Sequence, residues 1–340
     1  MLSSYAQLKK QLLNEQHVWL ITGVAGFIGS HLLEQLLQLN QQVIGIDNFA
    51  TGHQENLDTV FKKLTHFQAS QFTFYEGDIC SFVDCKKVIT DVEYILHQAA
   101  LGSVPRSIET PEITNATNVT GFLNVLIAAK NASVKRFVYA SSSSVYGDSP
   151  SLPKKEETIG RPLSPYAVSK YTNELYAQAF SACYGLETIG LRYFNVFGSR
   201  QDSNGPYAAV IPRWINALKN SQPVYIHGDG KTTRDFCYVK NAVQANLLAA
   251  MTKNPEAVNK VYNVAVGEQH SLNELYNLIV NTLELPKKPQ PIYQDFRQGD
   301  IRNSLADVSL IKADLCYEPT HTLQSGLKDA QQSILDENIL

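Results

Sequence analysis

The chain has 340 residues, of which 44% are apolar and 18% are charged, with 19 glycines and 14 prolines. This composition excludes an intrinsically disordered chain, a collagen and a coiled coil, and the length predicts one large domain or two that share a cleft. The 29 basic and 32 acidic side chains leave a formal net charge of −3. The sequence therefore lacks the basic excess that nucleic-acid-binding proteins use to neutralise phosphates.

The N-terminal segment, residues 1–17, places Tyr5, Leu8 and Leu12 at helical spacing among polar residues. This pattern predicts an amphipathic helix and differs from the uninterrupted apolar core of a signal peptide. No run of 18 or more predominantly apolar residues occurs, so we expect no membrane-spanning helix. The five cysteines are scattered and include no Cys-x-x-Cys pair, which predicts neither a disulfide framework nor a metal site. These features predict a soluble, cytoplasmic protein.

Strands and helices alternate through the first half of the chain. Short apolar runs predict the strands, and apolar residues at helical spacing predict the helices between them. Such alternation indicates a parallel sheet built from right-handed crossovers and covered by helices on both faces. The predicted strands are 18–22, 43–47, 72–76, 94–98, 136–141 and 188–193, and the predicted helices are 27–39, 111–130 and 166–184.

The regular alternation ends near residue 195, where shorter strands mix with helices. Strands are predicted at 224–226, 236–239 and 261–264, and helices at 242–251 and 272–283. The expected fold class is α/β: a Rossmann-type doubly wound parallel sheet with a smaller mixed α/β C-terminal substrate lobe. The expected domains are a helical extension (1–17), a dinucleotide-binding domain (18–195) and a substrate lobe (196–340), with the chain crossing back to the dinucleotide-binding domain.

A glycine-rich turn follows the first predicted strand and opens the first long helix. Its pattern is G-x-x-G-x-x-G, in which Gly23 permits the tight turn, Gly26 lets the backbone approach a pyrophosphate and Gly29 lets the helix pack close to the sheet. The next strand ends at Asp47, whose carboxylate can accept hydrogen bonds from both adenosine ribose hydroxyls and would repel a 2′-phosphate. This order of elements predicts that the protein binds NAD rather than NADP.

Further candidates follow the ends of later strands, where ligands bind in open α/β sheets. Asp78 and Ile79 follow the third predicted strand. The stretch Gln98-Ala99-Ala100 follows the fourth, and its small residues would let the backbone lie against a cofactor. His97, at the end of the same strand, is interpreted as a packed histidine rather than a catalyst.

The stretch Ser164–Lys170 carries a pair of side chains suited to proton transfer. Pro165 fits the first turn of a helix, which places Tyr166 and Lys170 at i and i+4 on one face. A lysine ammonium near a phenol stabilises the phenolate and lowers its pKa, so Tyr166 could take a proton from a sugar hydroxyl while hydride leaves the same carbon. The serines at 141–144, after the fifth strand, could hydrogen-bond the same hydroxyl.

Together these motifs resemble the extended short-chain dehydrogenase/reductase superfamily, whose members modify nucleotide sugars with NAD. The matching positions span nearly the whole chain and are Thr22–Gly29, Asp47, Asp78, Asn118, Ser142–Gly147, Tyr166 with Lys170, and Arg192–Asn195. The catalytic residues that the resemblance implies are Tyr166, Lys170, Ser142 and Ser143. The implied NAD-binding residues are Gly23, Gly26, Phe27, Ile28, Gly29, Asp47, Asn48, Phe49, Thr51, Gly52, Asp78, Ile79, Gln98, Ala99, Ala100, Asn118, Tyr166, Lys170 and Phe194.

The residues before Val145-Tyr146-Gly147 distinguish two reactions within this superfamily. Sugar-nucleotide dehydratases carry Thr-Asp-Glu there, because they need an extra acid and base to expel water, whereas this chain carries three serines, Ser142–Ser144. The resemblance therefore implies a 4-epimerase. Its steps would be oxidation at carbon 4 to a 4-keto sugar, rotation of that sugar, and return of the hydride to the opposite face, with Tyr166 as base and then acid.

The C-terminal lobe is expected to hold the nucleotide of a UDP-sugar. Gly228–Phe236 and Arg297–Asp300 resemble the family's diphosphate-binding segments, in which arginines would donate in a bidentate way to phosphate. The substrate-binding residues that the resemblance implies are Gly102, Ser103, Ser142, Ser143, Tyr166, Asn195, Val210, Tyr225, His227, Arg234, Arg297, Asp300 and Ser304.

The sugar is the least determined part of this assignment. Asp47–His53, Leu101–Ser107 and Asn195–Asp202 most resemble bacterial UDP-N-acetylglucosamine 4-epimerases of surface-polysaccharide pathways. In galactose-restricted epimerases a tyrosine that narrows the pocket occupies the position of Ser304, so a serine there implies room for a 2-acetamido group. Glucuronate 4-epimerases share the Ser-Ser-Ser-Val-Tyr-Gly stretch, and an epimerase of UDP-uronates or of UDP-hexoses in general stays an alternative.

A homodimer through a four-helix bundle is also implied by the resemblance, with the 111–130 and 166–184 helices in the interface. Leu123, Leu126, Tyr176 and Phe180 would fit such an interface but could equally face the sheet. A non-catalytic NAD-sensing protein is the alternative from another functional class, and the intact Tyr166 and Lys170 argue against it.

Overall fold

The computed structural model describes residues 4–203, 207–285, 288–296 and 302–337. Its centre is a seven-stranded sheet in the order β11-β6-β5-β4-β1-β2-β3, with every neighbouring pair parallel. The Rossmann-type fold is confirmed, and the six strands predicted before residue 195 form within one residue of their expected bounds. The strands are β1 (Val18–Thr22), β2 (Gln42–Asp47), β3 (Phe72–Glu76), β4 (Tyr94–His97), β5 (Arg136–Ser142), β6 (Thr188–Tyr193) and β11 (Lys260–Val264).

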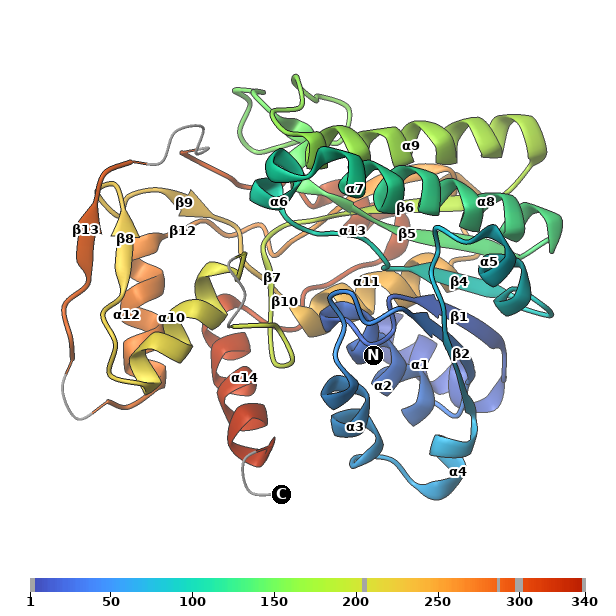
Figure 1. Ribbon diagram of the computed structural model, residues 1–340, viewed down its shortest axis with the longest axis horizontal. Coiled ribbons are helices and arrows are strands. Elements are labelled where there is room, and N and C mark those ends of the chain that lie inside the picture. The colour runs from blue at the N-terminus through green and yellow to red at the C-terminus, as the bar shows by residue number, and fades with distance from the viewer. Residues whose placement is uncertain (1–3, 204–206, 286–287, 297–301, 338–340) are drawn as a thin grey trace.

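The sheet strands are apolar because helices cover both of their faces. Alternate residues of β1 enter opposite cores: Trp19 and Ile21 pack with α2 (Phe27–Gln38) and α11 (Val239–Met251), whereas Leu20 packs with the helices of the other face. Figure 1 shows that other layer, which consists of α5 (Phe82–Val88), α8 (Phe122–Asn131) and α9 (Pro165–Tyr184).

The predicted N-terminal helix forms as α1 (Ser4–Asn14), and its Tyr5, Leu8 and Leu12 are buried in the core shared with α2. The buried Gln41 fastens the end of this extension to the sheet domain. Its amide donates to the carbonyl oxygens of Leu12 and Glu15, and its oxygen accepts from the N–H of His17 and from the Trp19 indole.

The single helix expected at 111–130 is corrected by the structure. The segment consists of α7 (Pro111–Asn115), a π-helical stretch (Ala116–Gly121) and α8. A π-helical insertion widens the turn and redirects the side chains that follow. Here the stretch contains Asn118, which bonds both the N–H and the carbonyl of Leu101 and also the Ser169 hydroxyl.

The sequence left open whether four apolar side chains of this helical layer face the sheet or a dimer interface. In the structure they face the sheet. Leu126 and Phe180 are buried in its core, and Leu123 and Tyr176 pack against that core. The short helices α3 (Gln54–Phe61), α4 (His66–Ser70) and α6 (Val104–Glu109), and the 3₁₀ turns Ser143–Tyr146 and Pro255–Ala257, were not predicted. Among the described helices, none has the length and apolar character of a membrane span.

The chain after residue 195 divides between the sheet and a separate lobe. Strand β11 adds to the sheet beside β6, and α11 and α13 (Ser309–Leu315) pack in the sheet core. The lobe, seen at the left of Figure 1, has its own core around Trp214, Ile226 and Leu275. Its elements are β7 (Val196–Phe197), α10 (Val210–Lys219), β8 (Tyr225–His227), β9 (Thr233–Arg234), β10 (Cys237–Tyr238), β12 (His270–Ser271), α12 (Leu272–Thr282), β13 (Ile292–Gln294) and α14 (Leu323–Glu337).

Candidate active site

A cleft of about 890 Å³ opens at the carboxyl ends of the sheet strands. Its wall includes residues that end or directly follow β1, β2, β3, β4, β5 and β6, and it continues to the start of the lobe at residues 195–196, 200–202 and 207–209. The sheet order reverses between β1 and β4, and ligands of open α/β sheets bind at such a reversal. The volume lies within the usual range for small-molecule and cofactor sites.

The glycine turn after β1 has the geometry of a phosphate cradle. Gly23 has a φ of +70°, and a Cβ there would lie 2.8 Å from the backbone of Ala99. A Cβ on Gly29 would lie 2.0 Å from the Gly23 carbonyl oxygen, so α2 approaches the turn more closely than any side chain permits. Helix α2 begins after Gly26 without a side-chain cap, which leaves the N–H groups of its first turn for an anion.

Asp47 ends β2 beside this turn, and two backbone groups orient its carboxylate. One oxygen accepts from the Ala25 N–H at 2.9 Å and the other from the Phe49 N–H at 2.9 Å. Burial raises the pKa of Asp47, while these N–H groups lower it. A carboxylate with two such bonds keeps lone pairs for further donors, so the turn and Asp47 together fit the pyrophosphate and ribose of a dinucleotide.

The structure brings nearly all of the sequence-predicted cofactor residues to the wall of one cleft. Asn48 and Asp78 also bond to each other at 3.0 Å at its edge. Three predicted residues do not line the cleft: Phe49 packs on Phe74, Asn118 lies behind the wall, and Phe194 is fully buried. Those that do line it are Gly23, Gly26, Phe27, Ile28, Gly29, Asp47, Asn48, Thr51, Gly52, Asp78, Ile79, Gln98, Ala99, Ala100, Tyr166 and Lys170.

The predicted catalytic residues meet where α9 begins and β5 ends. Ser164 caps α9 by accepting from the Ala167 N–H at 3.1 Å, which fixes the first turn and places Tyr166 in the cleft wall. Ser142 lies near enough to Tyr166 to lower the pKa of its hydroxyl. Ser142 and Ser143 both line the cleft, and the Lys170 ammonium donates to the Ala140 carbonyl oxygen at 2.9 Å.

The electrostatics of this cluster differ from the sequence-based expectation in one respect. Burial raises the pKa of Tyr166, whereas Lys170 was expected to lower it, and the nearby Ser142 side chain opposes that rise. Burial also lowers the pKa of Lys170 to about 8. The difference arises because both side chains are shielded from water, which disfavours their charged forms.

His97 is a packed side chain, as predicted. Its ring lies 5.3 Å from the ring of Phe122 and 5.7 Å from that of Phe137, and its Nδ1 is 2.9 Å from the Thr22 hydroxyl. Burial lowers the pKa of His97 to about 3. The imidazole therefore stays neutral at physiological pH and supports the floor of the site.

The predicted substrate residues divide into two groups. Gly102, Ser103 and Asn195 line the cleft together with Ser142, Ser143 and Tyr166, and Ser103 also caps α6 by accepting from the Arg106 N–H at 3.2 Å. The others among the described residues lie in the lobe outside the cleft wall, and there Ser304 and Arg234 are neighbours because the Ser304 N–H donates to the Thr233 carbonyl. That second group is Val210, Tyr225, His227, Arg234 and Ser304; Arg297 and Asp300 lie outside the described residues.

Several cleft residues were missed by sequence reasoning. Arg106 of α6 lines the cleft and stacks on the ring of Tyr207, with its guanidinium carbon 4.9 Å from the ring centroid. The Tyr207 hydroxyl donates to Glu109. Arg106 lies in α6, the first helix after β4, so its position shortly after a strand end was an available signal. Ile113, Thr117 and 207–209 had no comparable pattern.

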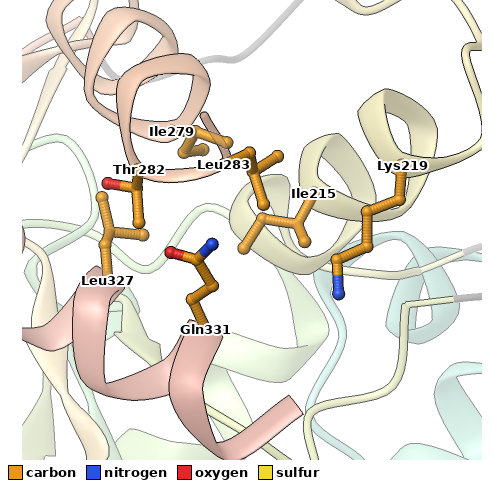
Figure 2. A pocket seen from close by; sticks show the side chains of 7 residues that line it. All are labelled: Ile215, Lys219, Ile279, Thr282, Leu283, Leu327 and Gln331. Carbon is orange, nitrogen blue, oxygen red and sulfur yellow. The ribbon is translucent and has the colours of Figure 1, made fainter. Parts of the chain in front are cut away.

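A much smaller gap lies in the lobe between α10, α12 and α14. Figure 2 shows its seven lining side chains, which are mostly apolar and include Ile215, Ile279 and Leu327. Its volume of about 10 Å³ admits about one water molecule, so it is a packing defect rather than a ligand site. Within the described part of the chain, no three His, Cys, Asp or Glu side chains form a group that could hold a metal ion.

Comparison with known proteins places this site in one family. The profile of the NAD dependent epimerase/dehydratase family matches residues 19–265. A putative UDP-glucose 4-epimerase of Methanocaldococcus jannaschii is 36% identical over 91% of this chain and 95% of its own, and a UDP-glucuronate 4-epimerase of Thermodesulfobacterium geofontis is 33% identical over 91% and 94%. The crystal structure of a UDP-N-acetylglucosamine 4-epimerase from Methanobrevibacter ruminantium, bound to UDP-N-acetylmuramic acid, superposes with a TM-score of 0.87 at 38% identity, covering 95% of this chain and 99% of that one. The chain belongs to the NAD-dependent epimerase/dehydratase family, and NAD is its cofactor.

Proposed function

We propose that the protein is a UDP-sugar 4-epimerase that interconverts UDP-N-acetylglucosamine and UDP-N-acetylgalactosamine. The observation that carries this proposal is that Tyr166 and Ser142 both lie in the wall of a cleft that also contains the dinucleotide cradle. The family match and the 4-epimerases among the relatives support the reaction. The resemblance in sequence supports a role in supplying sugars for surface polysaccharides, and the five free thiols favour the cytoplasm.

The residues of this chain fit each proton movement of such a reaction. The glycine turn and Asp47 would hold NAD, which would supply the hydride acceptor and donor for carbon 4 of the sugar. Tyr166 accepts the proton of the 4-hydroxyl as the ketone forms and gives it back when the alcohol is restored. Ser142 hydrogen-bonds the same oxygen in both states. No carboxylate lies at positions 142–144 to remove a second proton, which favours epimerisation over dehydration.

The 2-acetamido sugar is supported by the space at the sugar end of the cleft. Gly102 lines the cleft, and a Cβ built on it would meet nothing within 4 Å. Ser304 is the second support for the 2-acetamido sugar, because the galactose-restricted epimerases that the chain resembles carry a tyrosine at this position. Arg106 favours a second candidate, a UDP-uronate 4-epimerase, because its guanidinium lines the same cleft and could pair with a carboxylate on carbon 6.

An NMR time course with purified protein and no added NAD tests these alternatives. We expect UDP-N-acetylglucosamine to be converted faster than UDP-galactose and UDP-glucuronate, because the cleft is open and the regenerated cofactor stays bound. If only UDP-galactose reacted, the acetamido assignment would be wrong while the reaction class stood. Fastest conversion of UDP-glucuronate would select the second candidate, and failure on all three sugars would contradict the proposed function.

The Ser304→Tyr variant is the matched arm of that experiment. We expect it to suppress conversion of the acetamido sugars, because the larger side chain would narrow their pocket, and to spare UDP-galactose. Equal losses on both kinds of sugar would remove Ser304 from the account of selectivity.

We further propose that two copies of the chain pair through the outward face of the α8 and α9 layer. Val168 and Leu175 lie two turns apart on α9 and are about half exposed, at 51% and 48%. Light scattering should give twice the 37.8 kDa chain mass, and Leu175→Glu should shift the protein to the monomer mass. A monomeric wild-type protein would contradict this assignment.

A further inference from the structure

Helix α9 carries a third polar residue on the face that presents Tyr166 and Lys170. Glu174 follows Lys170 by four residues, and residues four apart lie on one helix face. The side chain of Glu174 is only 6% exposed, yet the proposed reaction gives it no proton to move. Its partners therefore decide what it does.

Glu174 is bonded to one residue from each of two strands, β5 and β6. Its carboxylate accepts from the Ser141 hydroxyl, and it accepts from the Arg192 guanidinium at 2.9 Å on one oxygen and 2.8 Å on the other. Ser141 and Arg192 are direct partners across the β5–β6 pair. Glu174 thus sits over two neighbouring strands and joins α9 to both.

Two consecutive residues of β5 are each bonded to one turn of α9. Lys170 donates to the Ala140 carbonyl, and Ser141 donates to Glu174. These two contacts set how far along β5 the helix lies. Ser142, the next residue of β5, lies with Tyr166 in the cleft wall and lowers its pKa, and the geometry of that approach depends on the two contacts.

Arg192 also braces the turn that follows Ser142. Its guanidinium carbon lies 4.8 Å from the ring centroid of Tyr146, which ends the 3₁₀ turn Ser143–Tyr146, and its remaining amine donates to the Glu156 carbonyl at 2.9 Å. Burial acts to lower the pKa of Arg192, but the hydrogen bonds and charge of Glu174 outweigh burial and raise it. Arg192 therefore keeps its charge beside Glu174.

We propose that Glu174 and Arg192 form a positioning pair that aligns Tyr166 with Ser142. The inference rests on the proposed epimerase function and deepens it. A buried ion pair contributes little stability compared with well-packed apolar residues of similar volume, so the fold itself does not require these charges. An apolar pair would lack the directional hydrogen bonds that connect α9 to Ser141 and to β6.

The test replaces the pair with apolar residues in the double variant Glu174→Leu/Arg192→Met, which avoids leaving one charge buried alone. We expect this variant to fold and to retain NAD, with KM for the UDP-sugar within about threefold of wild type and kcat lowered about 10- to 100-fold, since small misplacements of reacting groups cost this much. Ser141→Ala, which keeps the ion pair, should lower kcat by a smaller factor and serves as the second variant if the double variant does not fold.

The pKa of Tyr166 is the readout that a merely structural role would not change. It is measured without substrate, from the tyrosinate absorbance of each protein minus that of its Tyr166→Phe derivative. We expect it to rise by about 0.5 to 1 unit in the double variant, the equivalent of one weakened hydrogen bond. The acidic limb of the kcat profile should move to higher pH by the same amount.

Glu187→Gln is the matched control at the other end of the same two strands, where Glu187 pairs with Arg136 at 3.0 Å. It should leave kcat and the pKa of Tyr166 unchanged. A folded double variant with unchanged kcat and unchanged Tyr166 pKa would overturn the proposal. If the wild type converted no UDP-sugar, the proposed function would fail by itself, and the Tyr166 titration would still decide for or against the positioning pair.

Discussion

Replacing Tyr166 with phenylalanine is expected to lower kcat for 4-epimerisation by about 10²- to 10⁴-fold, the usual contribution of a positioned acid–base group. The variant removes only the phenol hydroxyl, so the amount of NAD that copurifies and the KM for the sugar should change little. Because burial raises the pKa of Tyr166, the wild-type kcat should rise with pH through the neutral range, and the residual kcat of the variant should not.

Tyr171→Phe is the matched control, since Tyr171 lies on the same helix but packs against the sheet core. It should keep wild-type kcat. The measurement is kcat over a range of pH for both variants, with NAD content determined after denaturation. A Tyr166→Phe variant within about tenfold of wild type would mean that another group transfers the proton.

The parts of the site that the sequence predicted are those held by local spacing. Gly23 has a left-handed φ, and a Cβ on Gly29 would meet the Gly23 carbonyl oxygen, so the glycine pattern itself reveals the turn. Tyr166 and Lys170 lie on one face because they are four residues apart in a helix. Asp47 was identified because it ends the strand next to the turn, and parallel strands bring such ends to one edge.

The parts that were missed depend on contacts between distant segments. Tyr207 contacts Arg106 in the cleft, and no spacing in the sequence predicts that these two residues meet. The π-helical stretch at Ala116–Gly121 is imposed by the bonds that Asn118 makes to Leu101 and Ser169, and helical periodicity alone gives no sign of it. The direction of the Tyr166 pKa was also misjudged, because burial is a property of the whole fold and outweighs the effect of a neighbour read from sequence.

Asp235 is the residue whose loss we expect to disturb the lobe most. It lies between Arg234 and the core residue Phe236 and is fully buried. Its carboxylate accepts from the N–H groups of Val266, Gly267 and Ala306 at 3.1, 3.0 and 3.3 Å. These bonds tie the Arg234 strand to the 266–267 loop and to the segment that carries Ser304, so Asp235 orders the predicted diphosphate and acetamido residues together.

Asp235→Ala is expected to destabilise the protein by about 3 kcal/mol or more, because it leaves three buried N–H groups without an acceptor. Asp235→Asn should destabilise the protein less than Asp235→Ala, since the carbonyl oxygen of asparagine can still accept from part of this set. Unfolding in urea followed by tryptophan fluorescence measures both, because Trp214 lies in the lobe core. An alanine variant as stable as wild type would show that water or a rearranged loop satisfies these groups.

The pH dependence of the difference between wild type and Asp235→Asn isolates the carboxyl group. Burial raises the pKa of Asp235 from 3.8 to about 6 in the folded protein, against the lowering effect of its three N–H donors. A raised folded-state pKa means that the folded protein holds this proton more tightly, so the stabilisation is complete below the unfolded pKa and is lost as pH rises through about 6. Relative to the asparagine variant, which does not titrate there, wild type should gain about 2.4 kcal/mol between neutral pH and about pH 4. A difference that stays constant over this range would mean that the three N–H donors outweigh burial and keep Asp235 ionised.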